Sequence, residues 1–250
     1  MQVEESLSSI DDPDVVVLTV KAFDTDEAAR IQLKSGRLST TVLTLQNGLG
    51  NVEILQRELS PRFVIAGSTT EGVTSVGPGV VNHLGNGTTW IGELNGKLTD
   101  RCASVKKLFH ESGLRTLVSN NILGVLWLKA IVNSAINPIS SLVGTTNEGL
   151  LKDPDLYDAC IKVVQEGKNL AKANGVKLPD SPTTMLARVL TLTGDNRSSM
   201  LQDIEAGRRT EIQQLNGILS DTGKRRGSGT PCNQLLTKLV RGLENSRFRG

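Results

Sequence analysis

The stretch DVVVLTVKAFDTDEAARIQLKSGRLSTTVLTLQ, residues 14–46, decides the fold of the first part of the chain. It begins and ends with runs, residues 14–20 and 40–46, in which almost every side chain is apolar or β-branched, as is typical of strands buried on both faces. Residues 24–36 between these runs predict a helix that ends at Gly36. A strand, a helix and a second strand in this order predict a βαβ unit with parallel strands and a right-handed crossover.

The pattern of elements changes along the rest of the chain. Up to residue 113 the sequence predicts a helix, a strand, a two-stranded hairpin with its turn at Gly85 to Gly87, and a helix, at residues 51–59, 63–70, 80–94 and 100–113. From residue 120 onward it predicts only helices, first in the opening stretch and then at residues 154–174, 182–192, 200–221 and 230–244. We therefore expect an α/β domain over residues 1–118 and an all-α domain over residues 119–250.

The bulk composition narrows the class of partner. The formal net charge is +2, from 28 basic and 26 acidic residues, which argues against nucleic acid or a membrane surface as a partner and favours a small molecule. We find no segment of about 20 apolar residues and no secretion signal, so we expect a cytoplasmic protein. Cys102, Cys160 and Cys232 are widely spaced, which predicts buried free thiols and neither a disulfide framework nor a zinc site.

A polar stripe on an apolar helix is the strongest functional signal. Residues 127–138 read WLKAIVNSAINP, and an α-helix turns about 100° per residue, so Lys129, Asn133 and Asn137 fall within an arc of about 80°. The remaining circumference is apolar, as in a helix buried on most sides. A buried ammonium group and two amides need partners, which either the protein or a ligand supplies. We expect Pro138 to end or kink this helix.

A carboxylate in an apolar stripe supports a site of this kind. On a continuous helix over residues 199–219, Glu211 lies within about 20° of Ile204, in the middle of the apolar face. A charged residue is rarely buried without a partner, so Glu211 either pairs with a buried cation, for which Lys129 is the natural candidate, or borders a cleft. An internal salt bridge or a snorkelling side chain is the alternative for Lys129, and contacts between helices are the alternative for the asparagines.

Position relative to the strands singles out two further sites. Lys21 directly follows the first predicted strand, and Asn47 follows the second, in the sequence Gln-Asn-Gly. Ligands of open α/β sheets bind beyond the carboxyl ends of the strands, so both residues face the expected crevice. Ordinary turn chemistry is the alternative, especially for Asn-Gly.

The remaining polar candidates have structural interpretations. Ser199 and Gln202 fit a capping box, in which the hydroxyl closes a helix N-terminus. His83 and His110 have no metal or triad partners by spacing, and we interpret both as structural. No metal site is predicted.

Together these segments resemble the ketopantoate reductase (2-dehydropantoate 2-reductase) family. The resemblance extends over almost the whole chain, through TVKAFDT, QNGLGNVE, GSTTEG, GVVNHLGNGTTWIG, WLKAIVNSAINPISSL, NEGLL, SSMLQDIEAGRRTEIQQLNG and TPCNQLL, in the family's order and approximate spacing. Lysine followed four residues later by asparagine is a weak motif alone, because other dehydrogenases with a helical second domain share it. The combination with INP and SMLQDI…TEI is specific.

The resemblance implies a fold and an activity. The fold is a Rossmann-type parallel-sheet domain, incomplete here, followed by a helical domain for substrate binding and dimerisation, similar to the C-terminal domain of 6-phosphogluconate dehydrogenase. The activity is reduction of 2-dehydropantoate to pantoate with NADPH, a step toward pantothenate and coenzyme A, with Lys129 as general acid. The implied substrate-binding residues are Asn47, Asn133, Asn137, Asn147 and Ser199, and the implied cofactor-binding residues are Lys21, Asn47, Val73 and Glu211. A homodimer is also implied.

This sequence departs from the family pattern at its beginning. The family starts with a strand, a G-x-G-x-x-G turn and a helix that bind the pyrophosphate, and no such motif occurs here. We therefore expect the first strand to expose a sheet edge and the affinity for the cofactor to be low. Two alternatives stay open: a non-catalytic helical interaction module, and a reductase of another branched 2-keto acid.

Overall fold

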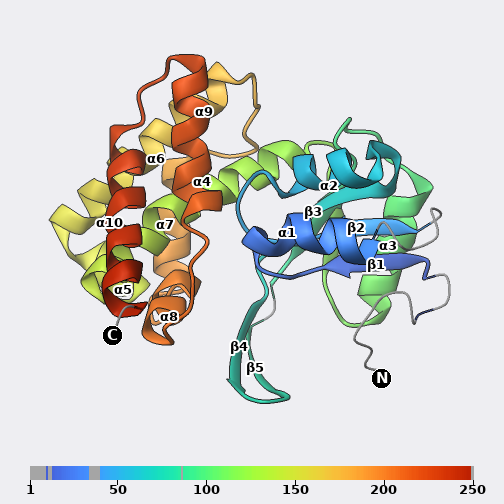
Figure 1. The fold of residues 1–250 in the computed structure, drawn as a ribbon, viewed down its shortest axis with the longest axis horizontal. Coiled ribbons are helices and arrows are strands. Elements are labelled where there is room, and N and C mark those ends of the chain that lie inside the picture. Colours follow the sequence, from blue (N-terminus) through green and yellow to red (C-terminus); the bar gives the residue numbers. More distant parts are fainter. Residues whose placement is uncertain (1–9, 11–12, 34–39, 86, 249–250) are drawn as a thin grey trace. The chain divides into compact units, whose positions relative to one another are not determined.

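The computed structural model describes residue 10 and residues 13–33, 40–85 and 87–248 of the 250-residue chain. These residues form two compact units. The first comprises the chain up to Gln46 and residues 50–126, and the second comprises residues 47–49 and the chain from Trp127 onward. The long helix α4 (Ile122–Val143) begins in the first unit and continues into the second (Figure 1). The units therefore divide inside α4, whereas the sequence suggested a division at residue 118.

The first unit is built on a five-stranded sheet with the order β1-β2-β3-β6-β7. Strands β1 (Val15–Leu18), β2 (Thr41–Thr44) and β3 (Val64–Thr69) are parallel, which confirms the prediction from the two β-branched runs. Strand β6 (Thr89–Gly92) runs antiparallel to β3 and parallel to β7 (Thr116–Val118). Within the described part of the chain, β1 is the last strand on one side of the sheet and pairs with β2.

Helices cover both faces of this sheet. Leu43, Ile65 and Ile91 project from three neighbouring strands onto Val105 and Phe109, and these residues form a core between the sheet and α3 (Asp100–Glu111). Figure 1 shows α1 (Thr25–Glu27) and α2 (Asn51–Leu59) on the other side of the sheet. The unit also contains two 3₁₀ turns and a π-helical segment, namely η2 (Ala22–Asp24), η4 (Pro61–Phe63) and η3 (Ala28–Leu33). The helix end predicted at Gly36 lies outside the described residues.

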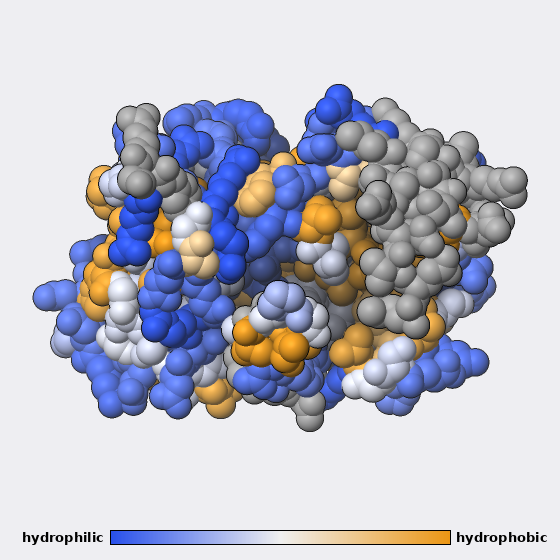
Figure 2. Space-filling model, turned by 60° about the horizontal axis from the view of Figure 1, so that its bottom comes forward, coloured by the Kyte–Doolittle hydropathy of each residue, from blue (hydrophilic) through white to orange (hydrophobic). Residues whose placement is uncertain are grey.

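The hairpin predicted from the Gly-Asn-Gly sequence is wrong in its pairing. Strand β5 (Val80–Gly85) pairs with β4 (Gly72–Gly77), which the sequence did not predict, whereas β6 joins the main sheet. The hairpin turns at Pro78 and Gly79, where the backbone φ of Gly79 is +71°, a conformation that glycine adopts without strain. Its valines are exposed, and Figure 2 shows this apolar surface in the lower centre; they are Val73, Val76, Val80 and Val81.

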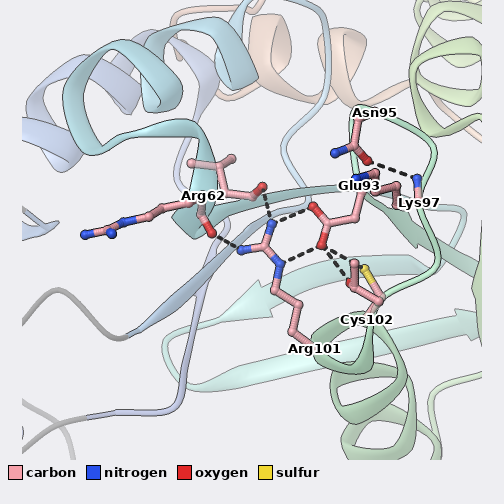
Figure 3. Close-up of polar contacts among 8 residues, drawn as sticks. Arg62, Glu93, Asn95, Lys97, Arg101 and Cys102 are labelled. Atoms are coloured by element: carbon pink, nitrogen blue, oxygen red, sulfur yellow. Dashed lines mark hydrogen bonds and ion pairs between the residues drawn. The ribbon is translucent and has the colours of Figure 1, made fainter.

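A buried ion pair fastens α3 to the sheet. Glu93, which directly follows β6, is 6% exposed and accepts hydrogen bonds from Arg101 Nε (2.6 Å) and Nη2 (2.5 Å) and from Thr99 Oγ1 (2.7 Å). Arg101 also donates to the carbonyl oxygens of Arg62 and Val64, which lie just before and at the start of β3 (Figure 3). The hydrogen bonds from Arg101 hold the pKa of the Glu93 carboxyl below its usual value.

We predict that Glu93→Gln lowers the free energy of unfolding by about 2 kcal/mol, because it leaves a partly buried guanidinium without its counter-charge. Urea unfolding followed by circular dichroism measures this difference. Because the folded-state pKa of Glu93 is depressed, the difference should be present above pH 4.5 and shrink as the pH falls through the folded-state pKa below that value.

Lys107→Gln is the matched control, since Lys107 lies on the same helix and its ion pair with Glu111 is exposed. It should change the unfolding free energy by less than about 0.5 kcal/mol. Equal effects of the two substitutions would contradict the role of the buried pair.

The second unit is helical, and its described residues contain no strand. Besides α4 it contains α5 (Asn147–Lys152), α6 (Pro154–Ala173), α7 (Pro182–Leu192), α8 (Ser199–Glu205), the π-helix η5 (Gln213–Gly217), α9 (Ile218–Arg226) and α10 (Pro231–Phe248). The largest core cluster joins α4 to α6 and α7 through Ile131, Ala135, Val164, Leu186 and Leu190, all with no exposed surface. The predicted starts and ends of α6 and α7 agree with the structure to within a residue.

Two predictions for the segment around α8 are wrong. The helix expected over residues 199–219 is interrupted, because α8 ends before Gly207, whose φ of +64° reverses the chain. Glu211 therefore lies between α8 and η5, and not on the face of a continuous helix. The cap of α8 is also one residue earlier than predicted, since Ser198 Oγ accepts the hydrogen bond from Leu201 N (3.2 Å).

Pro138 does not end α4. The helix continues for five more residues to Val143.

By its length and composition alone, α4 could cross a membrane, which the sequence analysis did not expect. However, 67% of its most apolar 18-residue stretch is buried inside the protein. That burial is the packing of a core helix.

Candidate active site

In the central part of α4, residues 127–141, solvent reaches the helix at the polar stripe. Across residues 127–141 every residue is buried except Lys129 and Asn133, which are partly exposed. Asn137, one turn further along, is 7% exposed. The side-chain amides of Asn133 and Asn137 form no hydrogen bond with any other residue that the structure describes. One helix therefore presents an amine and two amides, one turn apart, along its accessible face.

The Lys129 amine has an unusual titration. Its pKa falls from 10.5 to about 8, and burial is the larger cause, because removing an ammonium group from water disfavours the charged form. The negative charge of Glu211 opposes this effect and raises the pKa. The sequence predicted this pairing of Lys129 with Glu211, and the electrostatic interaction confirms that the two lie close to each other.

Apolar packing holds Glu211 near α4. Ile212 and Leu215, which follow Glu211, pack against Ala130, the residue after Lys129, in one buried cluster that Met200 completes. Glu211 itself is 8% exposed. The backbone carbonyl of Glu211 also accepts hydrogen bonds from Gln214 N (3.0 Å) and Leu215 N (3.1 Å), so this carboxylate is carried by a hydrogen-bonded turn. The prediction of a buried Glu211 is right, although the continuous helix on which it was based is not present.

The turn that carries Asn47 is bound to the same segment. Leu49 N donates a hydrogen bond to Gln214 O (2.9 Å), and Leu49 packs against the cluster of Ile212 and Leu215. Gly48 lies so close that a Cβ atom there would be 2.5 Å from Gln214 O, and its φ is +83°. Only glycine fits this approach. Asn47 therefore belongs to the helical unit in space, although the first unit precedes and follows it in the sequence.

Asn147 and Ser199 lie in two neighbouring segments of the second unit. Asn147 begins α5, is 2% exposed and donates from Nδ2 to Thr193 Oγ1 (2.7 Å), while its Oδ1 atom is buried without a hydrogen-bond partner. Ser199 begins α8 and is exposed. The preceding residue, Ser198, joins α8 to α4 through a hydrogen bond to Ser140 Oγ (2.7 Å). The chain thus brings the start of α8 to α4 just beyond Asn137.

The two remaining predicted residues belong to the first unit. Lys21 follows β1 and is partly exposed, and Val73 lies on hairpin strand β4, outside the main sheet, with 55% of its surface exposed. Gln46 ties the carboxyl ends of β1 and β2 together, because its Nε2 atom donates to Val20 O (2.9 Å) and to Thr25 Oγ1 (2.7 Å). Lys21 therefore lies at the edge formed by the carboxyl ends of two parallel strands.

The remaining histidines and cysteines were also candidates for a site. In the described ranges no group of three or more His, Cys, Asp or Glu side chains is placed so that it could hold a metal ion. His83 Nε2 lies 2.8 Å from Glu71 Oε2 across the exposed hairpin. Cys102 and Cys160 are buried, Cys232 is partly buried, and all three thiols are free.

Comparisons with known proteins identify the family of this chain. The family model described as ketopantoate reductase PanE/ApbA matches residues 1–96, and the model of its C-terminal part matches residues 121–244. A 2-dehydropantoate 2-reductase of Pyrococcus horikoshii is 42% identical over 93% of this chain and 76% of its own length.

Solved structures give the same result. The crystal structure of a PanE/ApbA family ketopantoate reductase from Ralstonia eutropha superposes with a TM-score of 0.89 at 31% identity, covering 97% of this chain and 79% of that one. A D-mandelate dehydrogenase bound to NADH and anilino(oxo)acetate superposes with a TM-score of 0.87 at 28% identity, covering 96% and 80%. A mixed, mainly parallel sheet followed by a helical unit thus defines a class of oxidoreductases. Within this class, the chain belongs to the ketopantoate reductase family.

We predict that Glu211→Gln lowers the pKa of Lys129 below its value of about 8, because the substitution removes the charge that favours the ammonium form and leaves the burial in place. Titration of the lysine side chains by ¹³C NMR, with Lys129→Met to assign the resonance, measures the change. Glu148→Gln is the control, since Glu148 pairs with Lys152 on α5, and it should leave the Lys129 titration unchanged. A rise of the Lys129 pKa in Glu211→Gln would contradict this electrostatic account.

Proposed function

We propose that this protein reduces 2-dehydropantoate to pantoate with NADPH and that Lys129 is the general acid. The observation that carries the proposal is Lys129 itself. Its amine has a pKa lowered by burial to about 8, it lies beside the carboxylate of Glu211, and within residues 127–141 of α4 Lys129 and Asn133 are the residues that are not buried. An amine of this kind is charged at neutral pH and gives up its proton readily. The family supports the reaction, since the relatives named above are 2-dehydropantoate 2-reductases and ketopantoate reductases.

The chemistry follows from where charge develops. A nicotinamide cofactor, when bound, would supply the hydride that the ketone carbon accepts. As the new C–H bond forms, the carbonyl electron pair moves to oxygen, and the Lys129 ammonium group stabilises this negative charge and transfers a proton to give the hydroxyl. Glu211 keeps the amine charged between turnovers. A partly desolvated site strengthens each of these interactions relative to water.

Amides and a hydroxyl are suited to the rest of the substrate. 2-Dehydropantoate carries a carboxylate and a hydroxyl besides its ketone, and Asn133 and Asn137 present their amides one and two turns from Lys129. We assign substrate binding to these two residues and to Asn47, Asn147 and Ser199. Binding by groups on one rigid helix fixes the ketone relative to the amine, which is a major part of the rate enhancement in bimolecular reactions.

One edge of the sheet in the first unit is suited to binding a nicotinamide dinucleotide. Its parallel strands place Lys21 at the carboxyl-end edge, where dinucleotides bind in this kind of sheet, and a lysine suits the additional phosphate of NADP. We assign cofactor contacts to Lys21, Asn47, Val73 and Glu211. The NADH complex of the D-mandelate dehydrogenase supports a nicotinamide cofactor.

A second substrate class has some support. The D-mandelate dehydrogenase structure contains anilino(oxo)acetate, a 2-keto acid derivative with an aromatic group, and Lys129 would act identically on any 2-keto acid. Comparing kcat/KM for 2-dehydropantoate with kcat/KM for branched and aromatic 2-keto acids, at the same NADPH concentration, distinguishes the two substrate classes.

We also propose a cytoplasmic location and a homodimer.

The test is the steady-state oxidation of NADPH by 2-dehydropantoate. Lys129→Ala should lower kcat/KM by about 10²–10⁴-fold, the usual contribution of a general acid. In the wild type kcat should fall as the pH rises through about 8, because only the protonated amine donates, and Glu211→Gln should move this fall to lower pH.

Lys152→Ala is the matched control, because Lys152 is exposed and pairs with Glu148 on α5. It should leave kcat/KM unchanged. Full activity of Lys129→Ala, or a kcat that does not fall above pH 8, would contradict the assignment of Lys129.

A further inference from the structure

Pro138 creates a defect in α4 at the point where the proposed substrate amides lie. In a regular helix the N–H of residue 138 would donate to the carbonyl of Ser134, four residues earlier, but proline has no N–H. Ser134 has no exposed surface, so water does not reach this carbonyl. A buried carbonyl without a donor destabilises a protein, and the turn that the missing hydrogen bond would have closed is held less firmly. Asn133 directly precedes Ser134, and Asn137 directly precedes Pro138, so the two amides flank the turn that lacks this hydrogen bond.

Another side chain supplies the missing donor. Asn216, in the π-helix η5, donates from Nδ2 to Ser134 O at 2.8 Å and, with the same nitrogen, to Asn233 Oδ1 at 3.0 Å. Asn216 is itself fully buried. Both hydrogens of its amide nitrogen are thus used, and one of them takes the place of the proline N–H.

The orientation of the Asn216 amide is fixed from the other side. Asn233 Nδ2 donates to Glu166 Oε2 (2.8 Å), which makes Asn233 Oδ1 the acceptor that faces Asn216. Glu166 also accepts from the first turn of α10, through Cys232 N (2.7 Å) and Asn233 N (3.0 Å). A carboxylate, a helix N-terminus and two amides therefore form one chain of hydrogen bonds that ends at Ser134 O.

The segment that carries Asn216 also holds other proposed site residues. Glu211 lies just before η5, and Gln214 O within η5 accepts the hydrogen bond from Leu49, two residues after Asn47. One short π-helical segment is thus tied to the turn of Asn47, to Glu211 and, through Asn216, to the turn of α4 between Asn133 and Asn137. Single π-helical turns frequently occur at functional sites.

We propose that Asn216 is a positioning residue for the 2-keto acid: by replacing the donor that Pro138 lacks, it holds the turn of α4 that sets the spacing of Asn133 and Asn137. This inference rests on the proposed function for its effect on substrate, but the bond itself is independent of catalysis. Asn216 does not act as an acid or contact the reacting atoms. Its loss should weaken substrate binding and leave the chemical step of the bound substrate almost unchanged.

Pro138→Ala makes the proposal testable, because alanine restores an N–H four residues after Ser134. We compare the wild type, Asn216→Ala, Pro138→Ala and the double variant, with KM and kcat for 2-dehydropantoate at saturating NADPH. With Pro138 in place, Asn216→Ala should raise KM about tenfold and change kcat less than threefold, since one lost buried hydrogen bond corresponds to roughly a factor of ten. When Pro138→Ala is already present, the same substitution of Asn216 should raise KM less than about threefold.

Asn174→Ala is the matched control. Asn174 Nδ2 also donates to a backbone carbonyl, Leu170 O, at 2.8 Å, but at the end of α6 and away from α4. It should lower the urea midpoint of unfolding and leave KM unchanged. A general loss of stability would instead raise KM in both asparagine variants.

Each other outcome has a defined meaning. The same rise of KM in both backgrounds, or no rise in either, would overturn the proposal. If Asn216→Ala does not fold, folding of the double variant supports the replacement of the proline donor, and failure of the double variant contradicts it. If the wild type neither oxidises NADPH nor binds the keto acid, the proposed function fails, and the urea midpoints of the four proteins still test whether Asn216 and Pro138 are coupled.

Discussion

The balance between burial and one carboxylate at the Lys129 amine is the constraint on which the rest of the structure depends. An ammonium group on a helix that is otherwise buried loses much of its hydration, and that loss lowers its pKa from 10.5 to about 8. Glu211 opposes the shift, so the amine stays charged near neutral pH. Neither effect alone would suit an acid: full hydration would keep the pKa near 10.5, and burial without Glu211 would favour the neutral amine.

Much of the second unit serves to keep this pair together. α4 packs against α6 and α7 through fully buried aliphatic side chains, so between residues 127 and 141 its accessible surface is restricted to the polar stripe. Ile212 and Leu215 bind the segment after α8 to Ala130, beside Lys129. The donor that a proline removes from α4 is replaced by a distant amide, that of Asn216. The amine and the two amides thus lie on α4, and the carboxylate of Glu211 comes from a separate segment that is fastened to the same helix.

Local sequence patterns predicted a large part of this fold. Continuous β-branched runs identified the parallel pair β1 and β2, and the helical periodicity with proline at the start and glycine after the end identified α6 and α7. The stripe of Lys129, Asn133 and Asn137 was visible because helical geometry alone puts these residues on one face. Glu211 could be predicted as the partner of Lys129 because a buried charged side chain requires a partner of opposite charge.

Long-range contacts decided what local patterns could not. A proline predicts the end of a helix unless a donor from elsewhere satisfies the freed carbonyl, and nothing near residue 138 reveals that Asn216 does so. The hairpin was placed at Gly85 to Gly87 because glycine marks turns, but Pro78 and Gly79 form the turn and β6 pairs with β3. The cap at Ser198 was missed for a different reason, because the capping-box pattern of Ser199 and Gln202, one residue away, gave an equally good local solution.

A crystal structure with NADP⁺ and a non-reducible 2-keto acid analogue would test the central claim most directly. The account predicts the carbonyl oxygen of the analogue within hydrogen-bond distance of Lys129 Nζ, with its carboxylate at the amides of Asn133 or Asn137. An analogue bound away from α4, or a Lys129 amine that contacts Glu211 but not the analogue, would contradict it.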